Sequence, residues 1–179
     1  MTCSAATMTP EIAFNLPLVS LRSLTDTRQI PAVTNQASRK IQFRMTGELS
    51  IEIEFGPTES EPTWLVRLME QSSRLLNLER NWNSYRSEPI HPDAVVGAIN
   101  FLLTNDQEVP IPAPDLVPHL SGGVQLEWHL RNYDLEVLVF PDGQYRISYS
   151  REGEDAIEDV VTRDPHIAGV ALQEIARSN

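Results

Sequence analysis

The sequence has a single cysteine, Cys3, among its 179 residues. No intrachain disulfide and no thiolate metal cluster can therefore form, and the reducing cytoplasm is the expected location. No window approaches the roughly twenty consecutive apolar residues that a membrane helix requires. The first thirty residues also lack the basic segment and the continuous apolar run of a signal peptide. We therefore expect a soluble cytoplasmic protein.

Motifs for catalysis and cofactor binding are missing as well. The chain has neither a phosphate-binding loop of the form Gly-x-x-x-x-Gly-Lys-Ser/Thr nor a Gly-x-Ser-x-Gly turn for a nucleophile. Its four histidines lack the spacing that places two metal ligands on one face of a helix. We expect no catalytic residue, no cofactor and no metal.

Basic residues are scarce, with 14 Lys and Arg against 25 Asp and Glu and a net charge of -11. Such a chain repels phosphate backbones, so we expect no direct binding of nucleic acid. The acidity either keeps the protein soluble or forms a face for a basic partner. The densest acidic run lies within residues 151–164, which we expect to form an edge strand or a loop, and includes Glu154, Asp155, Glu158 and Asp159.

The N-terminal residues 1–38 are rich in Thr, Ser, Ala and Gln and are interrupted by prolines, which predicts a partly irregular arm. Residues 39–179 are expected to form a single domain. Within the arm, the segment 14–21 carries the apolar residues Phe14, Leu16 and Leu18. This segment either adds a strand to the edge of a sheet or docks on a partner.

Alternating apolar residues predict antiparallel strands in two regions. In residues 40–55, the turn signal at 46–48 favours a hairpin, with a bulged single strand as the alternative. Residues 124–149 contain three apolar runs, and turn signals at 131–134 and 141–144 separate them. This second region predicts a three-stranded meander.

Apolar residues spaced by three and four predict helices at 62–79, at 92–103 and at about 164–177. The proline-rich stretch 109–118 is expected to be a stiff crossover from the second helix to the sheet, or else a ligand for a proline-binding domain. The expected fold is therefore α+β: an antiparallel sheet of about five strands, with the helix pair packed on it and a C-terminal helix.

Two stretches with distinctive motifs flank the second helix and the crossover. The first contains Trp82-Asn83-Ser84-Tyr85 followed by Pro89-Ile90, and the second is Gly122-Gly123-Val124-Gln125-Leu126-Glu127-Trp128. With these motifs, the chain resembles a family of small bacterial proteins that share this aromatic elbow, Pro-Ile helix start and Gly-Gly strand. The resemblance covers about residues 70–148. It implies a shared folding unit and a bacterial or phage setting, and it implies no reaction.

Two carboxylates of the meander, Glu127 and Glu136, fall on neighbouring strands. If they pair across the strands, they would share a proton or bind a cation, because two close like charges raise the pKa of one of them. The interpretation we prefer is that Glu127 accepts hydrogen bonds from the elbow or from Arg86 and so fixes the helix pair to the sheet. Trp82, Tyr85 and Trp128 form either an aromatic cage for a ligand or a clamp between loop and core.

The function we expect is that of a non-enzymatic protein-binding module: an inhibitor, an antitoxin-like protein or an adaptor subunit of a bacterial complex. Its partner is another protein, of basic charge if the acidic run binds it, or a second copy of the chain. The expected partner-binding residues are Phe14, Leu16, Leu18, Glu154, Asp155, Glu158 and Asp159. The alternative is an enzyme or small-ligand receptor with a pocket between the elbow and the Trp128 strand. The residues of that pocket would be Trp82, Tyr85, Arg86, Glu127 and Trp128.

Overall fold

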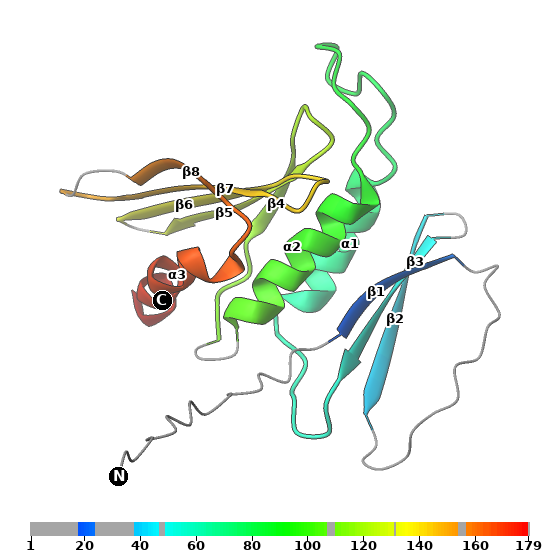
Figure 1. Cartoon of the computed structure of the whole chain (residues 1–179), viewed down its shortest axis with the longest axis horizontal. Helices are drawn as coiled ribbons and strands as arrows, with labels where there is room; N and C mark the ends of the chain where they lie inside the picture. The colour runs from blue at the N-terminus through cyan, green and yellow to red at the C-terminus, as the bar shows by residue number, and fades with distance from the viewer. Residues whose placement is uncertain are drawn as a thin grey trace, which may run out of the picture.

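The computed structural model describes residues 18–23, 38–46, 49–106, 110–130, 132–153 and 157–178 (Figure 1). Strands and helices alternate in blocks along the chain, as is usual for an α+β fold. In chain order the elements are β1 (Leu18–Ser23), β2 (Arg39–Thr46), β3 (Leu49–Phe55), α1 (Leu65–Leu75), α2 (Pro92–Asn105), β4 (Asp115–Pro118), β5 (Val124–Leu130), β6 (Tyr133–Val139), β7 (Tyr145–Arg151), β8 (Ile157–Thr162), the 3-10 helix η1 (Pro165–Ala168) and α3 (Gly169–Ser178).

The helix pair α1 and α2 lies between two antiparallel sheets (Figure 1). One sheet has three strands in the order β1-β3-β2, and the other has five in the order β4-β5-β6-β7-β8. Helix α1 contacts β2 and β4, while α2 contacts β1 as well as β5 and β6. Helix α3 closes one end of the core, where the Tyr149 hydroxyl of β7 donates a hydrogen bond to Glu174 of α3 (2.9 Å).

The burial of the two central helices follows from their sequences. In α1 the buried side chains are spaced by three and four and so occupy one face: Leu65, Leu68, Met69 and Ser72. In α2 the buried side chains point to several sides of the helix: Ala94, Val95, Ala98, Ile99, Phe101, Leu102 and Leu103. A helix that is apolar on most sides requires neighbours on most sides. Helix α2 therefore lies where both sheets can cover it.

The α+β class, the five-stranded antiparallel sheet, the helix pair and the C-terminal helix are confirmed. The strands of the large sheet differ from those expected, because the sequence analysis places all strands in one sheet and the structure has two. The hairpin β2–β3, which has a bulge between Arg44 and Thr46, pairs with β1 in a separate sheet. Strand β4 from the proline-rich crossover and strand β8 from the acidic run complete the five. The reason is that alternation shows which side chains share a face but not which strands are neighbours.

Strand β1 resolves one alternative for the N-terminal arm. Residues Leu18–Ser23 pair antiparallel with β3, from Leu18 opposite Glu54 to Ser23 opposite Leu49. This part of the segment 14–21 thus adds a strand to a sheet edge, while Phe14 and Leu16 lie outside the described residues.

No helix in the described part of the chain is long and apolar enough to cross a membrane.

The elbow between α1 and α2 is held by its own hydrogen bonds. The Asn81 N–H donates to the Ser87 carbonyl (2.8 Å), and the Asn81 side-chain oxygen accepts from the Arg86 N–H (2.8 Å). Asn81, Ser84 and Arg86 all have positive φ angles, of 65°, 67° and 64°. Non-glycine residues adopt this left-handed region only when their surroundings hold them there. The elbow is therefore a tightly specified turn.

The elbow also binds the turn that precedes β5. The Glu88 N–H donates to the Leu120 carbonyl (2.9 Å), and the His91 N–H donates to the Gly122 carbonyl (2.8 Å). Gly122 has a φ of 80°, and a Cβ atom there would lie 2.8 Å from the carbonyl oxygen of Pro89. The two distinctive stretches of the sequence thus contact each other through their backbones, which fixes the start of α2 against the start of β5.

This contact predicts the effect of Gly122→Ala, with Gly153→Ala as its matched control. Gly153 also has a left-handed φ, of 86°, but a Cβ there would meet no atom within 4 Å. Both variants should lose about 1–2 kcal/mol of unfolding free energy to backbone strain. Gly122→Ala should lose about 1–3 kcal/mol more, because its methyl group collides with Pro89. Equal losses in denaturant unfolding would show that the contact with the elbow is not tight.

Candidate functional site

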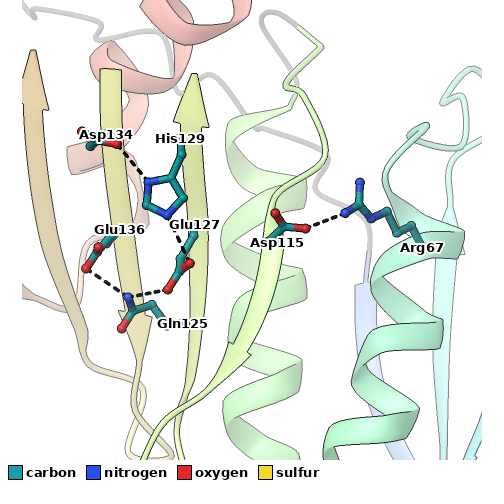
Figure 2. A network of polar contacts seen from close by, with 7 residues as sticks. All are labelled: Arg67, Asp115, Gln125, Glu127, His129, Asp134 and Glu136. Carbon is teal, nitrogen blue, oxygen red and sulfur yellow. Dashed lines mark hydrogen bonds and ion pairs between the residues drawn. The ribbon is translucent and has the colours of Figure 1, made fainter. Parts of the chain in front are cut away.

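A network of polar side chains lies on the outer face of the five-stranded sheet (Figure 2). Alternation along β5 sends Leu126 and Trp128 into the core and leaves Gln125, Glu127 and His129 on the opposite face. The antiparallel register then places Glu136 of β6 directly opposite Glu127, and Asp134 directly opposite His129. We refer to Gln125, Glu127, His129, Asp134 and Glu136 as the β5–β6 network.

The β5–β6 network is continuous through its hydrogen bonds. The Gln125 amide nitrogen donates to Glu127 (2.9 Å) and to Glu136 (3.0 Å). The His129 ring contacts Glu127 through Nε2 (3.2 Å) and Asp134 through Nδ1 (2.9 Å). A separate ion pair between Arg67 of α1 and Asp115 joins the helix layer to the edge strand β4 (Figure 2).

Carboxylates on both sides of the imidazole favour its charged form. The pKa of His129 is raised above the usual 6.5, mainly by the hydrogen bond with Asp134 and next by the hydrogen bond with Glu127. His119, at the other end of the sheet, behaves in the opposite way. Burial, with a smaller effect of the Arg146 charge, lowers the pKa of His119 below 6.5.

The cross-strand pairing of Glu127 with Glu136 is confirmed by the strand register. The partners of Glu127 differ from those that the sequence analysis prefers. Its hydrogen bonds come from Gln125 and His129 of its own strand, and not from the elbow or Arg86. The reason is that the elbow binds the turn before β5, whereas Glu127 lies in the middle of that strand. Within the network, Glu127, His129 and Glu136 are a set of side chains that could hold a metal ion.

The residues of the alternative pocket are not brought together. The Trp128 side chain is buried, and its indole N–H donates to the Pro112 carbonyl (2.9 Å). Trp82, Tyr85 and Arg86 belong to the elbow, which contacts the chain at Gly122. Trp128 lies four residues along β5 from its first residue Val124, or roughly 13 Å further at about 3.3 Å per residue. Tyr85 is 82% exposed and Trp82 is half-buried, so the elbow aromatics form no cage with Trp128.

The expected partner-binding residues lie mostly beyond what the structure describes. Leu18 is part of β1, and Glu158 and Asp159 are part of the edge strand β8. The side chains of these three residues are outside the described part, as are Glu154 and Asp155 altogether. The role of all five in partner binding stays a prediction.

An open groove of about 480 Å³ lies between α1 and the strand β2. Its lining combines apolar and charged residues, and we refer to it as the α1–β2 groove. The lining residues are Phe43, Arg44, Met45, Val66, Met69, Glu70, Ser73 and Arg74. The Ser73 hydroxyl donates to the Met45 carbonyl (2.9 Å) and ties the helix to the strand.

The sequence carries one local sign of the α1–β2 groove. Val66 lies off the apolar stripe of α1, and in the structure it is 52% exposed. Single exposed apolar residues are common, so this sign alone does not predict a site. The groove depends on the approach of α1 to β2, which the sequence pattern does not specify.

No protein-family model matches the chain, and neither a curated protein nor a solved structure matches it. The similarity to the bacterial family with the aromatic elbow therefore stays a prediction.

The two histidine environments predict opposite pKa shifts. In an NMR titration of the full chain, His129 should titrate above pH 6.5 and His119 below it. Asp134→Asn should lower the His129 midpoint more than Glu127→Gln, because the hydrogen bond that Asp134 accepts makes the larger contribution. Asp93→Asn, which removes the carboxylate beside His91, is the control and should leave His129 unchanged. A His129 midpoint at or below that of His119 would contradict the described contacts.

The same shift predicts how stability depends on pH. Because the folded state raises the pKa of His129, the network stabilises the fold fully below the unfolded value of about 6.5. This stabilisation is lost as the pH rises through the folded pKa. In denaturant unfolding, wild type and His129→Asn should therefore differ most below pH 6.5 and least above the folded midpoint. A difference that is constant with pH would show that the imidazolium form gains nothing from the network.

Proposed function

We propose that the protein is a non-enzymatic protein-binding module that holds an extended segment of a partner protein in the α1–β2 groove. The observation that carries this proposal is the position of an open, partly apolar groove beside an edge strand. Grooves between an edge strand and a helix suit extended peptides. The strand supplies backbone hydrogen bonds, and the groove accepts side chains.

The apolar lining supports an apolar anchor on the partner. Met45 and Met69 are 6% and 3% exposed, while Val66 at the same groove is 52% exposed. A partner side chain that covers Val66 would remove apolar surface from water on both molecules. Methionine side chains adapt to different shapes, so this lining would accept more than one apolar residue type.

The edge strand supports an extended conformation of the partner. Strand β2 has β3 on one side and no neighbour on the other within the described sheet. The backbone groups on its open side can pair with an added strand. Since the Ser73 hydroxyl already binds the Met45 carbonyl, the pairing is expected along Arg39–Arg44.

The charges of the groove support an acidic partner segment. Arg44 and Arg74 both line it, and neither forms an ion pair with another described residue. Glu70 is the single acidic residue among the lining residues. A carboxylate next to the apolar anchor would therefore gain a cationic partner. The groove thus carries more basic than acidic residues, whereas the whole chain has a net charge of -11.

The broader proposal is an inhibitor, an antitoxin-like protein or an adaptor subunit of a bacterial complex that acts in the cytoplasm. The chain has a single cysteine and needs no oxidising compartment to fold. The acidic run in residues 154–159 is proposed as a second contact surface for basic groups of the same partner. Phe14, Leu16 and Leu18 are proposed to extend the contact at the other end of the chain.

A peptide selection tests the groove. Random peptides displayed on phage and selected on the full chain should converge on an aliphatic or aromatic residue next to Asp or Glu. Val66→Asp should weaken the selected peptides by about tenfold or more, because it places a charge where the anchor binds. Arg74→Glu should weaken them and reduce the salt dependence of their affinity. Hydrogen exchange should show new protection of the β2 amides in the complex.

The matched control is Val170→Asp, which places the same charge at an exposed valine of α3. It should leave both the unfolding midpoint and peptide affinity unchanged. Peptides that bind Val66→Asp as well as wild type, or that protect β8 instead of β2, would sink the assignment to the groove.

A further inference from the structure

We propose that Glu127, His129 and Glu136 form a binding site for a divalent transition-metal cation such as Zn²⁺ (Figure 2). One potential ligand atom from each residue lies within 4.8 Å of those of the other two. Carboxylate oxygen and imidazole nitrogen are both ligands that Zn²⁺ binds in proteins. This site is independent of the α1–β2 groove, since it lies on the outer face of the other sheet.

The backbone already arranges the three ligands. Glu127 and His129 are two residues apart on β5 and so share a face, and Glu136 lies directly opposite Glu127 on β6. Side chains directly opposite on an antiparallel pair have Cβ atoms about 4.5–5.5 Å apart. Strand β5 is paired on both sides, with β4 and with β6. A bound cation would therefore need only side-chain rotations.

Asp134 sets the orientation of the imidazole. Its carboxylate holds Nδ1 of His129 at 2.9 Å, and this leaves Nε2 directed at Glu127, 3.2 Å away. Histidines that bind metals usually donate their other ring N–H to a carboxylate or a carbonyl, which fixes the tautomer and the direction of the ligand nitrogen. Asp134 and His129 have this arrangement, with Nε2 as the ligand atom.

Gln125 occupies the point between the two glutamates. Its amide nitrogen donates to both Glu127 and Glu136. A cation at the same point would likewise attract both carboxylates. Rotation of the amide by half a turn would direct its carbonyl oxygen to the same point. The Gln125 oxygen would then be a fourth ligand, beside two carboxylates and one imidazole.

The charges of the set match a divalent ion. Two carboxylates and a neutral imidazole balance a charge of +2, and the imidazole nitrogen has to be free of a proton to bind the metal. The neighbouring strands do not oppose this balance. Asp115, opposite Glu127 on β4, is paired with Arg67, and the residue opposite Glu136 on β7 is Ser148.

Calorimetric titration with ZnCl₂ tests the site on the full chain in a Cys3→Ser background, which removes the one thiol. One ion per chain is expected, with an affinity that rises with pH as His129 loses its proton. Glu127→Gln, Glu136→Gln and His129→Asn should each weaken binding by more than about tenfold, and Asp134→Asn by about tenfold. Zinc should also raise the unfolding midpoint of wild type by mass action.

His166→Asn is the matched control, because it removes an exposed histidine that lies on η1. It should bind zinc as wild type does. NMR should show the His129 ring signals, and not those of His166, shifting on addition of zinc. The absence of saturable heat, or equal affinity of wild type, Glu127→Gln and Glu136→Gln, would overturn the proposal.

Discussion

The fold depends on the burial of helix α2 from two sides. Its apolar side chains face the three-stranded sheet at β1 and the five-stranded sheet at β5 and β6. Each sheet has an apolar face that would meet water without the helix layer, so the hydrophobic effect joins both sheets to one set of helices. The elbow fixes where this layer begins, because His91 at the start of α2 is hydrogen-bonded to Gly122 before β5.

This arrangement decides which surfaces are left for binding. The apolar faces of both sheets point inward, so the outer face of the five-stranded sheet carries polar side chains such as Gln125, Glu127 and His129. Helix α1 covers β2 incompletely, and the α1–β2 groove is what remains open between them. The elbow has a different role, since its backbone hydrogen bonds hold the layers together.

The sequence predicts local structure well and the partners of strands poorly. Period-two alternation identifies the meander and the hairpin, and the spacing of apolar residues identifies all three helices, because these signals lie within a few residues of each other. The separation of the hairpin into its own sheet depends on contacts between distant segments. Strand β1 pairs with β3 across some thirty residues, and β4 arises within a proline-rich stretch whose composition predicts only an extended path.

The two candidate sites also differ in how far local signals in the sequence predict them. The pairing of Glu127 with Glu136 could be predicted, since a tight turn between adjacent strands sets their register. The same register brings His129 and Asp134 together. Both residues lie on strands, so the spacing of histidines that is typical of a helical metal site does not predict their contact. In both candidate sites, residues on the outer side lie next to residues that stabilise the core, as Glu127 does to Trp128 and Val66 to Leu65. Binding can therefore change at one position of each pair while the packing at the other holds the fold.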